Sequence, residues 1–112
     1  MIIEYSDFSK LDMRVGLITQ CKKVSKSKNL LRLMIDCGEK EIRQIIAGFS
    51  QFYSPEELVN KKVVVLLNLK PKRIMGLESQ GMILAADLNN EPFLLKIDER
   101  NGKSIHPGSI IK

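Results

Sequence analysis

Two apolar segments of strand length, residues 63–69 and 82–86, are joined by a long and chemically mixed connection. A β-hairpin needs only about two to five connecting residues. This connection instead holds three cations, one proline, two glycines and a Glu-Ser-Gln step. Loops held by a rigid scaffold often carry function. The connection is therefore the first candidate for a binding site.

The rest of the chain predicts further short strands at residues 13–24, 30–36, 41–47, 81–87 and 93–97. Gly16 lies inside the first and predicts a bulge or a bend there. The run 63–67 is apolar on both faces, which is typical of a central strand. Ser54 as N-cap, Pro55 at the first position and Glu57 completing a capping box predict a short helix. These segments give roughly five strands with the helix between the third and the fourth, and periodicity alone assigns this order to a small all-β barrel or sandwich.

The length of 112 residues predicts one domain, residues 1–112, with its own core. No apolar run is long enough to cross a bilayer. The N-terminus lacks the form of a signal peptide. Cys21 and Cys37 make neither a close metal pair nor a disulfide framework. We therefore expect a cytoplasmic protein with two reduced thiols and no membrane contact.

Positive charge is concentrated in two segments. The formal net charge is +5 and the isoelectric point is about 9.3, which favours a polyanionic partner. The first basic group consists of Lys22, Lys23, Lys26, Lys28 and Arg32. The second basic group consists of Lys70, Lys72 and Arg73. Either group alone is explained equally well as a solvated loop. Two groups that a barrel brings together favour a binding face.

The residues of an enzyme site are not evident. His106 is the one histidine and has no sequence partners for a triad. There is no P-loop phosphate cradle and no acidic spacing for a metal loop, so we expect neither cofactor nor metal. The run 23–27, Lys-Val-Ser-Lys-Ser, resembles the catalytic K-M-S-K-S loop of class I aminoacyl-tRNA synthetases. That loop needs a large nucleotide-binding domain, for which this chain is too short, and we interpret the match as coincidence.

The connection resembles a family signature, N-L-K-P-x-K-[LI]-[MR]-G-x-x-S-x-G-M-[LI]-L-A, at almost every specified position of residues 68–85. The opening 8–16, the segments 30–38 and 43–48, and Pro107-Gly108 also fit. The family is that of the tRNA-binding domain. It includes free-standing tRNA-binding proteins, the C-terminal appendage of many methionyl-tRNA synthetases and the CsaA-type chaperones. The resemblance implies a five-stranded OB-fold barrel with a short helix between strands 3 and 4.

One departure from the family concerns the loop before Leu30. Many members have H-P-x-A-D-K there, whereas this chain has Lys26-Ser27-Lys28-Asn29. Lys28 replaces a usual aspartate and makes the loop more basic. Family contacts in this loop therefore do not transfer to this chain.

The resemblance implies non-catalytic binding of structured tRNA, largely independent of tRNA identity. Lysine and arginine neutralise phosphates without reading sequence, and Pro71 stiffens the segment that carries the second basic group. The aromatic residues do not lie between the cations in the sequence, which favours a folded RNA over a stacked single strand. The predicted RNA-binding residues are Lys22, Lys23, Lys26, Lys28, Arg32, Asn68, Lys70, Lys72, Arg73, Ser79, Gln80 and Met82.

Four of these residues have an alternative role of equal or greater weight. Asn68, Ser79 and Gln80 offer hydrogen bonds either to RNA or to the backbone of their own loop. Met82 either lies against a nucleotide or, as we favour, packs in the core.

The resemblance also implies a homodimer, which apolar residues near both termini support. A CsaA-like chaperone that binds unfolded or export-bound peptides is the alternative function. It would use flexible methionines such as Met34, Met75 and Met82. The sequence leaves open whether a tRNA-binding protein of this kind acts alone or docked on methionyl-tRNA synthetase.

Overall fold

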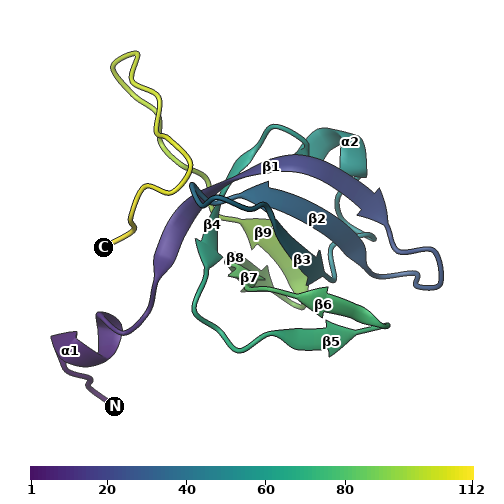
Figure 1. Ribbon diagram of the computed structural model, residues 1–112, viewed down its shortest axis with the longest axis horizontal. Helices are drawn as coiled ribbons and strands as arrows, with labels where there is room; N and C mark the ends of the chain where they lie inside the picture. Colours follow the sequence, from purple (N-terminus) through teal and green to yellow (C-terminus); the bar gives the residue numbers. More distant parts are fainter.

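A bent five-stranded antiparallel sheet forms the body of the molecule, for which the computed structural model describes residues 1–112 (Figure 1). Its strand order is β3-β2-β1-β4-β7. The strands are β1 (Met13–Lys23), β2 (Leu31–Asp36), β3 (Arg43–Ala47), β4 (Lys62–Leu66) and β7 (Met82–Ile83). The sheet curls until β3 and β7 approach each other. This confirms the predicted five-stranded OB-fold barrel.

The curl of the sheet comes from the long strand β1. Residues 13–17 of β1 pair with β4, and residues 17–23 pair with β2, so that Leu17 has a partner on each side. The register shifts between Ile18 and Gln20, and bulges of this kind bend a strand. The register shift lies a few residues beyond Gly16, where we predicted a bulge or a bend. A Cβ at Gly16 would lie 2.6 Å from Cγ2 of Ile35 and 2.8 Å from Cγ2 of Val65, so glycine is required for close packing.

The core fills the inside of this barrel. Alternate residues of β2, namely Leu31, Leu33 and Ile35, are fully buried, as a strand with one face inward requires. The three valines at 63–65 are also buried, which confirms β4 as a central strand. Leu58 of helix α2 (Pro55–Leu58) is fully buried in the same cluster. The helix therefore closes one end of the barrel.

Helix α2 lies between β3 and β4, as predicted. The Glu57 backbone N–H donates to Oγ of Ser54 at 3.3 Å, and the Ser54 N–H donates to Oε2 of Glu57 at 3.1 Å. Pro55 occupies the first turn. These contacts confirm the predicted capping box. The Ser54 N–H and hydroxyl hold the pKa of Glu57 below its usual value.

The predicted strands of the second half have different boundaries. The connection contains a hairpin, β5 (Lys72–Ile74) and β6 (Leu77–Ser79), where we expected a loop. The single strand expected at 81–87 is divided into β7 and β8 (Ala85–Leu88). β8 leaves the barrel to pair with β9 (Glu91–Leu94), through a two-residue turn in which Asn89 and Asn90 have φ of 50° and 68°. Two successive positive φ values are typical of the type I′ turn that joins twisted strands.

The C-terminal segment is hydrogen-bonded to the start of β1. Helix α1 (Tyr5–Phe8) precedes it. The Val15 N–H donates to the Ser109 carbonyl at 2.9 Å, and the Ile111 N–H donates to the Met13 carbonyl at 2.9 Å. Glu99 anchors the loop between β9 and Ser109. It accepts hydrogen bonds from Lys62 Nζ at 2.6 Å and from the Ile105 N–H at 2.7 Å. The structure contains no helix with the length and apolar character to span a bilayer.

Candidate nucleic-acid interface

The first basic group occupies the β1–β2 hairpin. Lys22 and Arg32 stand directly opposite each other in the ladder and are exposed, as are Lys23, Lys26 and Lys28. Like charges at opposite ladder positions destabilise a sheet. Arg32 donates from Nε to the neutral amide oxygen Oε1 of Gln44 at 2.7 Å, which leaves its charge uncompensated. This hairpin end therefore attracts anions.

The second basic group lies at the β5–β6 arm, which we define as residues 68–81. Lys72 and Arg73 open β5, and adjacent residues of a strand point to opposite faces. The turn consists of Met75 and Gly76, with φ of 53° and 78°. A left-handed conformation costs a methionine about 1–2 kcal/mol. The turn presents the Met75 side chain to solvent.

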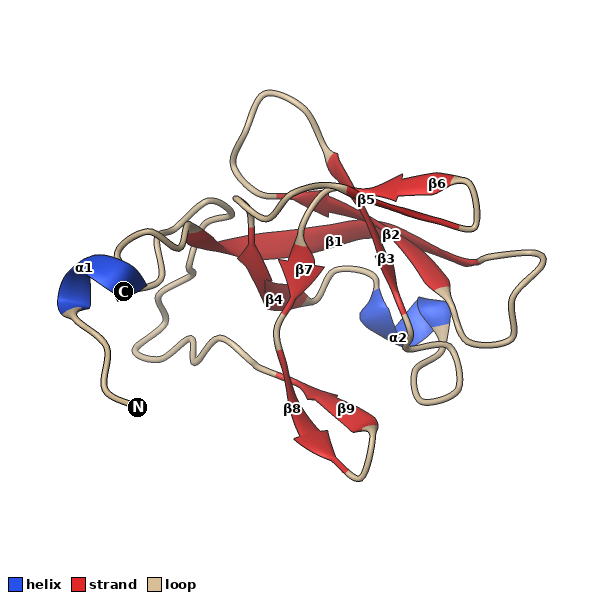
Figure 2. Cartoon of the chain, turned by 90° about the horizontal axis from the view of Figure 1, so that it is seen from below, coloured by secondary structure: helices blue, strands red, loops and turns tan.

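The barrel brings the two basic groups to one end of the molecule. The β1–β2 hairpin and the β5–β6 arm project in the same direction in two perpendicular views (Figures 1 and 2). The four ion pairs of the structure use Lys10, Arg14, Arg43 and Lys62. All eight cations of the two basic groups lie outside these pairs. Their charge is therefore available to an external polyanion.

The polar residues of the signature hold the arm in place. Asn68 accepts from the Asp12 N–H at 2.8 Å and donates to the Lys10 carbonyl at 2.6 Å. Ser79 is 5% exposed, and its hydroxyl accepts from the Ile46 N–H at 3.0 Å. Gln80 accepts through Oε1 from the Gln44 N–H at 3.0 Å. All three residues thus have the structural role that was the alternative, although these partners are backbone groups outside the arm rather than in its own loop.

Met82 is not a core residue, and our expectation that it packs inside is wrong. Its side chain is 49% exposed, because β7 is an edge strand and the facing edge β3 does not pair with it. Met82 instead lines a groove of about 350 Å³ between the two edges. The floor of the groove includes Ile45 and Ile83, and Lys70 and Lys72 stand at its rim.

Sequence reasoning did not select Arg43 and Gln44 of β3. Both residues bind the β5–β6 arm, and we call this junction between β3 and the arm the barrel seam. Nη1 of Arg43 donates to the Leu67 carbonyl at 2.9 Å, just before the arm, and to the Gln80 carbonyl at 2.8 Å, near the end of the arm. The Gln44 side chain donates from Nε2 to the Glu78 carbonyl at 2.9 Å while accepting from Arg32. Their one sequence signal is the polar pair that begins an otherwise apolar strand.

Arg43 is oriented by Glu39, with Nε and Oε1 2.6 Å apart. This hydrogen bond lowers the pKa of Glu39 and raises that of Arg43. Burial raises the pKa of both thiols, Cys21 and Cys37, to about 11, so they are neutral at physiological pH. No group of three or more His, Cys, Asp or Glu side chains is arranged to hold a metal ion.

Comparison with known proteins agrees with this geometry. Residues 13–104 match the family model described as "Putative tRNA binding domain". The methionine–tRNA ligase of Methanosarcina mazei is 55% identical over 86 residues, which are 77% of this chain and 12% of the ligase. This chain thus spans about an eighth of that relative.

Two solved structures superpose over the whole chain. A MetRS-related protein from Pyrococcus horikoshii is 32% identical with a TM-score of 0.86, covering 100% of this chain and 99% of that one. The chaperone CsaA from Bacillus anthracis str. Ames is 27% identical with a TM-score of 0.85, covering 100% of both chains. On its sequence and its barrel, the chain belongs to the tRNA-binding domain family.

Proposed function

We propose that this chain is a non-catalytic module that binds structured tRNA at the end of the barrel where the two basic groups lie. One observation carries the proposal: eight cations on two neighbouring projections take part in no ion pair. An interface that positions phosphates provides affinity without reading bases. Binding is therefore largely independent of tRNA identity.

The predicted site residues have two roles in this proposal. The cations of both basic groups contact phosphates, with Arg32 and Arg73 able to form two hydrogen bonds to one phosphate. Met82 contacts a nucleotide from the groove wall. Asn68, Ser79 and Gln80 act through the arm that they hold. Rigid positioning lowers the entropy lost when the arm contacts RNA.

We further propose a homodimer that works in the cytoplasm and supplies tRNA affinity to methionyl-tRNA synthetase in trans. The apolar side chains of Met1, Ile2, Ile3 and Ile110 are between 57% and 115% exposed, and a two-fold interface would bury them. The identity with part of a methionine–tRNA ligase supports the synthetase as partner.

The groove between β3 and β7 favours a second candidate function, peptide binding. It is mostly apolar, and the nearby Met75 and Met82 are about half exposed. Flexible thioethers adapt to varied apolar partners. The likeness to a CsaA chaperone supports this candidate. The lysines at the groove rim favour a polyanion over an average peptide, and the tRNA proposal therefore ranks first.

Fluorescence anisotropy with three labelled ligands at one ionic strength distinguishes these functions. The ligands are tRNA, a single-stranded oligonucleotide and an unfolded peptide. The proposal expects tRNA to bind at least about tenfold more tightly than either of the others. Equal affinity for the single strand contradicts recognition of a folded RNA. Tightest binding of the peptide supports the chaperone function instead.

A further inference from the structure

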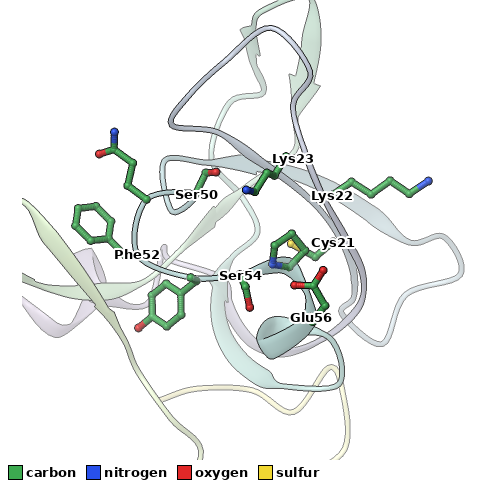
Figure 3. Close-up of a pocket in the computed structure, with 10 residues that line it drawn as sticks. Cys21, Lys22, Lys23, Ser50, Phe52, Ser54 and Glu56 are labelled. Atoms are coloured by element: carbon green, nitrogen blue, oxygen red, sulfur yellow. The ribbon is translucent and has the colours of Figure 1, made fainter.

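A second depression lies where β1 ends beside the loop that leads to α2. It has a volume of about 550 Å³, which is adequate for a nucleotide. Lys23, Ser50, Phe52 and Glu56 surround it, and Cys21 lies at its inner side (Figure 3). Lys23 reaches across the opening, whereas Lys22 extends away from it. The depression is separate from the β3–β7 groove.

This depression changes the inference that cations and aromatic residues are not interleaved. Phe52 is 29 residues from Lys23 in the sequence, yet both line the same pocket. Phe52 is 41% exposed, so its ring is open to solvent at this pocket. A pocket with an aromatic ring and a lysine in its wall offers one group to stack a base and another to hold its phosphate.

The pocket wall is fixed by contacts of its own loop. The Ser50 N–H donates to the Asn29 carbonyl at 3.1 Å, which ties the loop to the β1–β2 hairpin. The Tyr53 hydroxyl accepts from the Leu94 N–H at 3.2 Å, and its ring packs edge-on against Phe49 at 6.1 Å. The backbone that carries Phe52, whose N–H donates to the Phe49 carbonyl at 2.9 Å, is therefore held in place before any ligand binds.

Glu56 determines which base suits the pocket. An ionised carboxylate only accepts hydrogen bonds. Guanine presents two adjacent donors, N1–H and the 2-amino group, which match its two oxygens. Uracil presents one N–H between two carbonyl oxygens, which the carboxylate repels. The Cys21 thiol beside Glu56 is neutral, because burial raises its pKa to about 11, so it does not oppose the phosphate of a nucleotide.

We infer that this pocket binds one unpaired guanine nucleotide of an RNA, with the base between Phe52 and Glu56 and the phosphate at Lys23. The inference rests on the proposed function for the identity of the RNA. It extends that function from phosphate contacts alone to a preference at one unpaired nucleotide.

NMR titration of the whole ¹⁵N-labelled chain with nucleoside 5′-monophosphates tests the pocket without tRNA. GMP is expected to shift the amides of residues 21–23, 50–54 and 56 and to bind at least about fivefold more tightly than UMP, as one two-bond contact provides. Glu56→Gln is expected to reduce this preference to below about twofold. Glu91→Gln, at another exposed glutamate, is the control and keeps it. Phe52→Leu is expected to weaken the binding of both GMP and UMP.

Equal affinity for GMP and UMP, shifts confined to other residues, or a preference that survives Glu56→Gln would overturn the inference. The outcomes separate it from the proposed function. Salt-dependent tRNA binding with no GMP preference leaves the tRNA proposal standing and removes the guanine pocket. Selective GMP binding without tRNA binding supports the pocket and shows that it serves a different RNA.

Discussion

Arg32 of the first basic group is hydrogen-bonded to Gln44, with Nε and Oε1 2.7 Å apart, and the other end of the same amide holds the β5–β6 arm through the Glu78 carbonyl. One side chain thus connects the two basic groups. Because Arg73 stands opposite Glu78 in the arm, Gln44 sets the spacing between Arg32 and Arg73. A folded RNA that contacts both groups depends on that spacing.

Replacing Gln44 is therefore expected to uncouple the two basic groups. With Gln44 present, the tRNA-binding free energy lost by the double variant Arg32→Ala/Arg73→Ala should differ from the sum of the losses of the two single variants by about 0.5–1 kcal/mol. In a Gln44→Leu background the two costs should add. Gln20→Leu is the control, because Gln20 is an exposed glutamine of β1 without a side-chain hydrogen bond. Equal coupling in both backgrounds removes the role given to Gln44.

The second basic group is expected to matter more than cations elsewhere. Lys70→Ala with Arg73→Ala should weaken tRNA binding by roughly 1–3 kcal/mol, because charge-assisted contacts are lost. Lys96→Ala with Lys103→Ala removes the same charge from an exposed segment beyond the barrel. Lys62 is unsuitable as a control because it is paired with Glu99. If both double variants remain folded and lose the same tRNA affinity, the RNA is bound by diffuse positive charge rather than by the second basic group.

Gly16 is expected to tolerate no side chain. A Cβ there would overlap Ile35 and Val65, so Gly16→Ala should lower the free energy of unfolding by about 1–3 kcal/mol. Urea denaturation measures the change. Gly48→Ala is the matched control, since its Cβ would meet only the Asn29 carbonyl, at 4.0 Å. Because lost glycine flexibility by itself stabilises a protein, a loss at Gly48 as large as that at Gly16 would contradict overlap as the cause.

The Glu39–Arg43 pair predicts an acid-sensitive seam. The pKa of Glu39 is lower in the folded protein than the ordinary 4.5, so its contribution to stability is complete above pH 4.5 and is lost as the pH falls through the folded value. Glu39→Gln should therefore flatten the pH dependence of the free energy of unfolding below pH 4.5. Parallel curves for the two proteins in that range contradict this contribution.

The dimer is expected at micromolar concentration. Ile2→Asp combined with Ile110→Asp places charge at two of the most exposed apolar side chains and should give a 12.7 kDa monomer in sedimentation. Leu88→Asp alters a comparably exposed residue of the β8–β9 hairpin and should leave the dimer intact. A wild-type protein that sediments as a monomer would disprove the dimer.

Local signals in the sequence predicted the parts of the fold that local contacts determine. The capping box of Ser54 and Glu57 spans three residues, and the buried valines of β4 are adjacent, so both were predictable. The seam was not, because Arg43 reaches Gln80 across 37 residues of sequence. The proximity of Phe52 to Lys23 also depends on the closed barrel. Chemistry at such long-range contacts becomes visible only in the structure.

Salt dependence of tRNA binding tests the central claim most directly. If the two basic groups neutralise about four to six phosphates, the logarithm of the association constant should fall against the logarithm of salt concentration with a slope of about −3 to −5. Removing Lys70 and Arg73 should make that slope shallower by about one to two. A slope near zero between low and physiological salt would contradict an interface built on these eight cations.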